Sequence, residues 1–441
     1  MNTLEQLRAG QLAGSRRLKL SCGLTAFPRE IFDLAETLEI LDLSGNALAS
    51  LPADLPRLRK LRILFCSDNR FAELPEVLGQ CTRLSMVGFR ANRIRTVTDS
   101  ALPSALRWLV LTDNQVGQLP PGIARCTQLQ KLMLAGNCLQ TLPCEMVACT
   151  RLELLRVAAN RLTALPEWLF SLPRLAWLAY AGNPLGELHE LAARTRAPIA
   201  RIAWNTLQVG QPLGEGASGV IHQAQWRRGG ASQDVAVKFF KGALTSDGLP
   251  QSEMDACLGA GAHPNLIPLL GKLGEHPAGA DGLVMPLISP RFISLAAPPS
   301  LDSCTRDVYA ADTRFALDTV LCLALGVVSA VRHLHAQGIV HGDLYAHNVL
   351  HDTHGEVLLG DFGAASFFAP EDIPRALALQ RIEVRAFSCL LEELLERSSA
   401  PVGAADTWKG LADLHAACAQ ETTGGRPSFS EIEQILLALQ T

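Results

Sequence analysis

Three glycines in the second half of the chain have a spacing that could cover a phosphate group. Gly214, Gly216 and Gly219 form a G-x-G-x-x-G pattern between the predicted strands 207–209 and 220–224. Backbone N–H groups in such a pattern can cradle phosphates, although the pattern alone is weak evidence. A dinucleotide-binding fold would place a helix directly after the glycines, whereas the residues after Gly219 predict a second strand. The sequence therefore favours a glycine-rich hairpin over phosphates.

A lysine follows in an apolar setting. Residues 235–237 are Val-Ala-Val, Lys238 comes next, and Phe239 follows it. This pattern predicts a strand that carries one lysine. A buried ammonium group costs several kcal/mol unless an opposite charge partners it, so we expect Lys238 to have a buried partner. Glu253 lies fifteen residues further on, in an expected helix.

Further signatures follow in a fixed order. In chain order they are His263-Pro264-Asn265, Leu283-Val284-Met285, His341-Gly342-Asp343 with Asn348, Asp361-Phe362-Gly363, Ala369-Pro370-Glu371 and Gly425-Arg426-Pro427. Together with the glycines and Lys238, this order resembles the protein kinase family, nearest in style to the tyrosine-kinase-like group. The resemblance covers residues 207–440 and implies an α+β two-lobed protein kinase fold.

The resemblance implies a site for ATP and Mg²⁺. The implied ATP-binding residues are Gly214, Glu215, Gly216, Gly219, Ile221, Ala236, Lys238, Glu253, Met285 and Leu287. The implied catalytic residues are Lys238, Asp343, Asn348 and Asp361. Lys238, held by Glu253, would bind the phosphates, and Asp343 would orient the incoming hydroxyl and accept its proton. Asn348 and Asp361 would hold the metal, because Mg²⁺ prefers hard oxygen ligands.

The resemblance also has structural implications for the larger lobe. It implies a buried ion pair between Glu371 and Arg426. It places a long apolar helix over residues 321–335 and a central buried helix over residues 383–396. Glu383 stands there in place of the usual aspartate.

Three departures from the kinase pattern concern regulation and catalysis. Gly342 replaces the arginine that would bind a phosphorylated activation loop. The segment from Asp361 to Glu371 is about half the usual length or less, and Ser366 is its only hydroxyl. We therefore expect activity that is independent of loop phosphorylation. Tyr345 replaces the lysine that contacts the γ-phosphate in serine/threonine kinases. The nearby His347 is interpreted as an exposed loop histidine rather than as a partial replacement for that lysine.

Two functions remain open at this point. The first is an ATP- and Mg²⁺-dependent protein kinase with serine or threonine as the default acceptor, since all the phosphate-handling residues are present. The second is an ATP-binding pseudokinase scaffold that works through its N-terminal half. Gly342, Tyr345 and the short segment favour the second hypothesis.

The N-terminal half contains a repeat. Asn46, Asn69, Asn92, Asn114, Asn137, Asn160 and Asn183 recur every 22 or 23 residues. The text around them, as in Leu129-x-x-Leu132-x-Leu134-x-x-Asn137-x-Leu139, resembles the leucine-rich repeat over residues 18–185. This resemblance implies an α/β repeat solenoid, the leucine-rich-repeat horseshoe. We expect the asparagine amides to bond neighbouring coils, and Cys81, Cys126 and Cys149 to be buried apolar fillers rather than metal or redox groups.

The strands of such a solenoid leave an open inner face that commonly binds proteins. The residues expected to face outward there include Asp42, Phe65, Asp68, Arg90, Asp113, Met133 and Arg156, with Ser67, Val110 and Thr112. We expect a protein partner or substrate on this face, while a spacer role for the arc remains the alternative.

Charge and composition agree with two domains. Residues 1–200 carry a net charge of +6, and the whole chain has −4, which leaves −10 for the rest. We assign residues 1–185 to the repeats, 186–206 to a cap or linker, and 207–441 to the kinase domain. The scattered basic residues argue against nucleic-acid binding, and the lack of a long apolar run argues against a membrane span. Without a signal pattern, the twelve cysteines indicate free thiols in a cytoplasmic protein.

Overall fold

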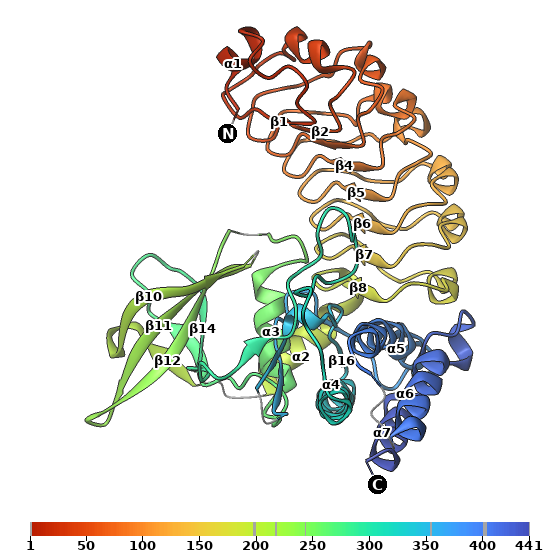
Figure 1. Cartoon of the computed structure of the whole chain (residues 1–441). Helices are drawn as coiled ribbons and strands as arrows, with labels where there is room; N and C mark the ends of the chain where they lie inside the picture. Colours follow the sequence, from red (N-terminus) through yellow and green to blue (C-terminus); the bar gives the residue numbers. More distant parts are fainter. Residues whose placement is uncertain are drawn as a thin grey trace. The chain divides into compact units, whose positions relative to one another are not determined.

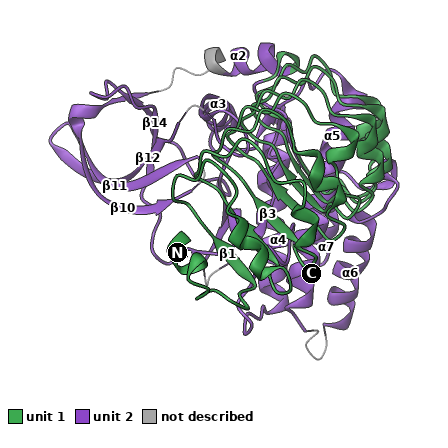
Figure 2. Cartoon of the chain, turned by 90° about the horizontal axis from the view of Figure 1, so that it is seen from above, with its two compact units in different colours: residues 1–175, 183–185 green, residues 176–182, 186–441 purple. Residues whose placement is uncertain are grey.

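The computed structural model describes residues 2–196, 200–216, 218–242, 244–352, 355–399 and 404–440. The chain divides into two compact units (Figure 2). Unit 1 consists of residues 1–175 and 183–185, and unit 2 consists of residues 176–182 and 186–441. Unit 2 therefore takes in seven residues that the sequence pattern places in the last repeat copy.

Unit 1 consists of similar coils that follow one another along the chain (Figure 1). After the short helix α1 (Leu4–Arg8), each coil contributes one three-residue strand, and each strand pairs in parallel with the strand of the next coil. The strands are β1 (Arg17–Lys19), β2 (Ile40–Asp42), β3 (Ile63–Phe65), β4 (Met86–Gly88), β5 (Trp108–Val110), β6 (Lys131–Met133) and β7 (Leu154–Arg156). The return segments hold 3₁₀ turns: η1 (Arg29–Leu34), η2 (Leu55–Arg57), η3 (Glu76–Gln80), η4 (Asp99–Ala101), η5 (Pro121–Arg125), η6 (Cys144–Ala148) and η7 (Glu167–Ser171). This arrangement is compatible with a repeat solenoid.

The asparagines join adjacent coils, as predicted. The Asn137 amide nitrogen donates to the carbonyl oxygens of Leu111 in the preceding coil (2.9 Å) and Leu134 in its own coil (3.0 Å). Its amide oxygen accepts from the Val116 N–H at 2.9 Å. One buried side chain thus satisfies backbone groups that no strand pairing reaches, and the same bonds recur at the other copies.

The three repeat cysteines are buried fillers, as predicted. Cys81, Cys126 and Cys149 all lie in the interior, and burial raises their pKa to about 11, 11 and 12 respectively. A thiol with a raised pKa is a poor nucleophile and a poor metal ligand near neutral pH. All twelve cysteines are within the described residues and are free thiols.

Unit 2 opens with the strand β8 (Trp177–Ala179) and the helix α2 (Glu187–Arg196), followed by a mixed six-stranded sheet. The sheet strands are β9 (Arg201–Ala203), β10 (Leu207–Glu215), β11 (Gly219–Arg228), β12 (Ala231–Phe240), β13 (Gly271–Gly274) and β14 (Gly282–Pro286). Their order is β10-β11-β12-β14-β13-β9, so a strand from the predicted linker 186–206 completes one edge. A cap or linker was predicted over residues 186–206. The structure has a helix followed by a strand there, and residues 197–199 lie outside the described residues.

One helix lies between β12 and β13 in the chain, and four further helices of the described residues follow the sheet strands. The first helix is α3 (Pro250–Ala260), and the others are α4 (Leu317–Ala336), α5 (Ile373–Glu396), α6 (Ala405–Cys418) and α7 (Phe429–Ala438). Short strands lie between them: β15 (Ile293–Ser294), β16 (Ile339–Val340), β17 (Val349–His351), β18 (Val357–Leu359) and β19 (Ser366–Phe367). The helices predicted over 321–335 and 383–396 are both present, the second starting ten residues earlier than expected. By length and composition α4 could cross a membrane, but more than half of it is buried inside the unit.

Candidate active site

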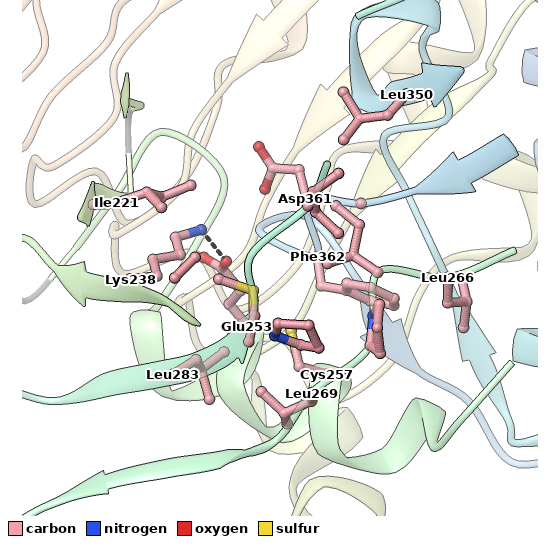
Figure 3. A pocket seen from close by; sticks show the side chains of 18 of the residues that line it. Ile221, Lys238, Glu253, Cys257, Leu266, Leu269, Leu283, Leu350, Asp361 and Phe362 are labelled. Atoms are coloured by element: carbon pink, nitrogen blue, oxygen red, sulfur yellow. Dashed lines mark hydrogen bonds and ion pairs between the residues drawn. The ribbon is translucent and has the colours of Figure 1, made fainter. Parts of the chain in front are cut away.

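A cavity of about 330 Å³ lies in unit 2 beside the sheet (Figure 3). Many of the residues predicted to bind ATP line it: Gly216, Gly219, Ile221, Ala236, Lys238, Glu253, Met285 and Leu287. Asp361 and Phe362 also line it. The walls are mainly apolar, and the charged groups are few, which is the usual composition of a small-molecule site.

The glycines form a hairpin, as predicted. Strands β10 and β11 pair antiparallel, with irregular register between Val209 and Gly214, and the Gly216 N–H donates to the Gly219 carbonyl oxygen. Gly219 is required by space, because a Cβ atom there would lie 2.3 Å from the Phe239 carbonyl oxygen. Gly214 and Glu215 are exposed and do not line the cavity, and Glu215 forms an ion pair with Lys241, which directly follows β12.

Lys238 has the buried acidic partner that the sequence requires. It lies on β12, between Ile221 of β11 and Leu283 of β14, and its ammonium group forms an ion pair with the Glu253 carboxylate of α3 (Figure 3). The exposed fractions of the two side chains are 12% and 3%. Burial acts to lower the pKa of Lys238, but the carboxylates of Glu253 and Asp361 outweigh it and hold that pKa above its usual value. The lysine is therefore charged and fixed in place.

Asp361 brings a second carboxylate to the same cavity. Its backbone has a φ of 55°, a left-handed conformation that aspartate adopts more readily than most residues. One carboxylate oxygen accepts from the Gly363 N–H at 3.1 Å. The rest of its side chain is exposed, so an oxygen is available to a ligand.

Asp343 and Asn348 lie on the loop between β16 and β17, beside the cavity rather than in its lining. The Asn348 amide nitrogen donates to the Asp343 carboxylate at 2.8 Å and to the Asp343 carbonyl oxygen at 2.9 Å. The Asn348 carbonyl oxygen accepts from the N–H of Gly360, the residue before Asp361, at 3.0 Å. These hydrogen bonds hold the loop that carries Asp343 next to the segment that carries Asp361.

The oxygen atoms of Asn348 and Asp361 fit a magnesium ion. Both are hard donors, and Mg²⁺ usually takes only one or two protein ligands and completes its shell with water and substrate phosphates. Among the described residues no cluster of three or more His, Cys, Asp or Glu could hold a metal without such a substrate.

The short segment after Asp361 is tightly held. Ser366 is fully buried in β19, which pairs with β16. Its hydroxyl accepts from the Tyr180 N–H at 3.0 Å. Gly342 has a φ of 72°, and a Cβ atom there would lie 2.5 Å from the Ala364 carbonyl oxygen and 2.7 Å from that of Leu178. A side chain at position 342 would therefore collide with both carbonyl oxygens, and that of Ala364 belongs to the short segment.

Two expectations in this region are wrong. The side chain of Glu371 is 77% exposed and lies near His189, so it forms no buried ion pair; Arg426 instead donates to the carbonyl oxygens of Gln420 and Arg381. The short segment leads into a longer α5, which leaves Glu371 at the surface. His347 is no exposed loop histidine, because it is half-buried and hydrogen-bonded to Asp307 at 2.8 Å.

The predicted partner face of unit 1 is only partly exposed. Asp68, Arg90 and Asp113 are exposed and Phe65 is half-buried. Asp42, Met133 and Arg156, expected to face outward, are buried, as is Thr112. The Asp42 carboxylate accepts from the Ser44 N–H and pairs with Lys19 in the preceding coil.

Three residues near the site were missed by the sequence reasoning: Trp177, Tyr180 and Glu190. The sequence does contain an indication for Tyr180. It occupies a repeat position that is otherwise apolar, and a buried tyrosine usually needs a polar partner. The equivalent positions in the other coils carry Leu43, Cys66, Phe89, Leu111, Leu134 and Val157. Glu190 follows the last repeat without any pattern that marks it.

Comparison with known proteins agrees with this geometry. Residues 207–389 match the sequence model of the family described as "Protein tyrosine and serine/threonine kinase". The chain is 30% identical to the serine/threonine-protein kinase bur1 of Neurospora crassa over 166 aligned residues. The alignment covers 37% of this chain and 28% of that protein. It is 29% identical over 168 residues to mitogen-activated protein kinase kinase kinase 1b of Physcomitrium patens, covering 37% and 20%. A probable serine/threonine-protein kinase of Dictyostelium discoideum is 27% identical over 164 residues, covering 37% and 9%. The chain thus spans less than a third of each of these relatives, and unit 2 contains a protein kinase domain.

Proposed function

We propose that unit 2 is an ATP- and Mg²⁺-dependent protein kinase that transfers the γ-phosphate to serine or threonine hydroxyls. The observation that carries this proposal is the buried ion pair of Lys238 and Glu253 in the same cavity as Asp361. Phosphoryl transfer depends on positioning and charge stabilisation more than on covalent chemistry. A charged lysine fixed beside an available carboxylate meets both needs.

Each residue has a defined task in this proposal. Lys238 binds phosphate oxygens, and Glu253 keeps the ammonium group in place. Asn348 and Asp361 hold Mg²⁺, which when bound neutralises the charge on the phosphates. Asp343 orients the acceptor hydroxyl and takes its proton, and the amide of Asn348 holds the Asp343 carboxylate still. Met285 and Leu287 line the cavity, and in this proposal they hold the adenine.

Activity without phosphorylation of the short segment is part of this proposal. Ser366 is the only hydroxyl of that segment, and it is buried and already hydrogen-bonded. Position 342 has no room for a phosphate-binding arginine. Phosphatase treatment should therefore leave the rate of the purified protein unchanged.

The test of the activity is transfer of labelled γ-phosphate to a mixed set of protein acceptors in the presence of Mg²⁺. The variant Asp343→Asn should lower the rate by about 10²-fold or more, because it removes the proton acceptor without changing the size of the side chain. Asp413→Asn is the matched control, since Asp413 lies exposed on α6 away from the site. Phosphoamino acid analysis of the product then identifies the acceptor type. Equal labelling by wild type and Asp343→Asn would overturn the proposal.

The alternative is a pseudokinase scaffold, favoured by Tyr345, which is buried rather than directed at a phosphate as a lysine would be. An ATP-binding protein that transfers no phosphate under any of these conditions would support it. Binding and transfer are therefore measured on the same preparations.

For unit 1 we propose a leucine-rich-repeat domain whose inner face binds a protein partner or substrate. The recurring strand, asparagine bonds and proline-initiated 3₁₀ turns support the repeat assignment. The exposed charges of that face are Asp68, Arg90 and Asp113. Reversing all three charges in the full chain should abolish partner capture in a pull-down, whereas reversing Arg151 and Glu167, which lie outside the strands, should not. Capture by the triple variant at the wild-type level would contradict this role.

A further inference from the structure

We propose that residues 176–193 form a built-in positioning element of the kinase site, in which Trp177 and Tyr180 fix the catalytic loop and the short segment while Glu190 fixes the helix that carries Glu253. The inference rests on the proposed kinase activity. It names the groups that hold the site in the absence of a phosphorylated loop. Trp177, Tyr180 and Glu190, the residues that make these contacts, all belong to unit 2.

Trp177 holds the catalytic loop by two contacts. Its indole ring stacks on the ring of Tyr345, with centroids 4.1 Å apart and planes at 7°. Its indole N–H donates to the Leu344 carbonyl oxygen at 3.1 Å. Leu344 and Tyr345 directly follow Asp343, so Trp177 fixes the backbone that carries the proposed base. Tyr345 thus serves as a docking surface and not as a substitute for the missing lysine.

Tyr180 holds the short segment. Its N–H donates to the Ser366 hydroxyl at 3.0 Å, and its own hydroxyl donates to the Phe367 carbonyl oxygen at 3.0 Å. Both Tyr180 and Ser366 are buried. Buried hydrogen bonds of this kind are costly to break, because the partner left behind loses its solvation as well. The bonds therefore fix the chain a few residues after Asp361.

Glu190 connects this element to α3. One carboxylate oxygen accepts from the Gly182 N–H at 2.7 Å, and the other accepts from the Ser252 hydroxyl at 3.3 Å. Ser252 directly precedes Glu253, and Glu190 is itself buried. This buried hydrogen bond connects Glu190 to the helix turn that presents Glu253 to Lys238.

The element reaches both halves of the site at once. Trp177 acts on the loop of Asp343, whereas Glu190 acts on the pair that binds the phosphates. The two contacts predict different kinetic effects. Loss of Trp177 should lower kcat with little change in the KM for ATP, because Trp177 does not line the ATP cavity. Loss of Glu190 should also raise the KM for ATP, because it loosens the Glu253–Lys238 pair.

The test is steady-state kinetics of the full chain with Trp177→Leu and Glu190→Leu, corrected for the folded fraction. Trp177→Leu should lower kcat by about tenfold or more, as expected for a misplaced catalytic group. Glu190→Leu should raise the KM for ATP as well as lower kcat. The conservative variants Trp177→Phe and Glu190→Gln keep the ring and one acceptor oxygen, and should recover most of the loss. Trp168→Leu, a half-buried tryptophan of unit 1, is the matched control.

Two results would overturn the inference. One is a kcat for Trp177→Leu equal to that of Trp168→Leu. The other is a loss of activity in Trp177→Leu and Glu190→Leu that only matches the unfolded fraction of each variant, with the same KM for ATP in both.

A separate measurement keeps this inference distinct from the proposed activity. If the wild-type protein transfers no phosphate, the proposed function fails, and hydrogen–deuterium exchange decides the inference. Trp177→Leu should then increase exchange in residues 341–349, and Glu190→Leu should increase it in residues 250–260, while Trp168→Leu changes neither. Unchanged exchange in both stretches would exclude the positioning role.

Discussion

The indole ring of Trp177 lies flat against the ring of Tyr345, with centroids 4.1 Å apart. Tyr345 occupies the position at which serine/threonine kinases carry a catalytic-loop lysine. The contact explains why this chain has an aromatic residue there. A substitution at position 345 is therefore expected to affect the packing of the catalytic loop, and through it the stability of the protein, more than the chemical step.

Restoring the lysine should therefore harm the protein. Tyr345→Lys removes a stacked aromatic pair worth about 0.5–1.5 kcal/mol and places an ammonium group in a buried position. We expect a lower free energy of unfolding in urea and no gain in kcat. Tyr345→Phe, which keeps the ring, is the control. A stable Tyr345→Lys variant with a higher kcat would show that the stacking contact is unimportant.

Restoring the arginine at position 342 should also fail. Gly342→Arg places a side chain in a left-handed backbone conformation and against two carbonyl oxygens, so we expect a loss of at least about 2 kcal/mol in the free energy of unfolding. Gly424→Arg is the control, because a Cβ atom at Gly424 meets nothing within 4 Å. The measurement is the urea midpoint of each variant. Wild-type stability of Gly342→Arg would contradict the close approach of Leu178 and Ala364.

A negative charge at Ser366 should inactivate the protein. In a kinase that is activated by loop phosphorylation, a negative charge on the loop would instead increase activity. Ser366→Asp buries an unpaired carboxylate beside the Tyr180 N–H and costs about 3 kcal/mol or more. We expect a lower melting temperature and a lower rate of phosphate transfer per folded molecule. Ser399→Asp, at an exposed position, is the control. Increased activity of Ser366→Asp would mean that the segment is regulated by phosphorylation after all.

A buried carboxylate predicts how stability changes with pH. Burial, with a smaller contribution from the Asp307 charge, raises the pKa of Glu393 to about 7, against the effects of its bond to the Tyr309 hydroxyl and of the Arg397 charge. The unfolded chain ionises this group near its usual value of 4.5, while the folded chain keeps it protonated until about pH 7. The free energy of unfolding should therefore fall as the pH rises through this range. Glu393→Gln should flatten the curve in urea titrations between pH 5 and 8, whereas Glu396→Gln, an exposed neighbour, should not.

Much of the fold and the site follows from local pattern. The 22- and 23-residue asparagine spacing predicts the coils, and the bonds of Asn137 confirm the physical reason for it. The buried partner of Lys238 follows from the cost of an unpaired charge in an apolar strand. The coils depend on residues that are close in sequence, and the ion pair depends on the large free-energy cost of burying one unpaired charge.

Other features could not be predicted, because they depend on which distant segments meet. Nothing near Trp177 in the sequence indicates that it stacks on Tyr345. The burial of Asp42 depends on Lys19 in the preceding coil. The exposure of Glu371 follows from how the short segment leads into α5. In each case the deciding contact lies outside the motif.

The most direct test of the central claim is the thermal unfolding of the full chain with ATP, with and without Mg²⁺. If the cavity beside Lys238 binds the magnesium complex of ATP, a concentration of 100 Kd should stabilise the protein by about 2.7 kcal/mol. Lys238→Met should lose most of this stabilisation, and Asp361→Asn should lose the part that depends on Mg²⁺, whereas Lys272→Met on β13 should behave as wild type. The absence of any shift in the wild-type protein, or an equal shift in Lys238→Met, would contradict the account.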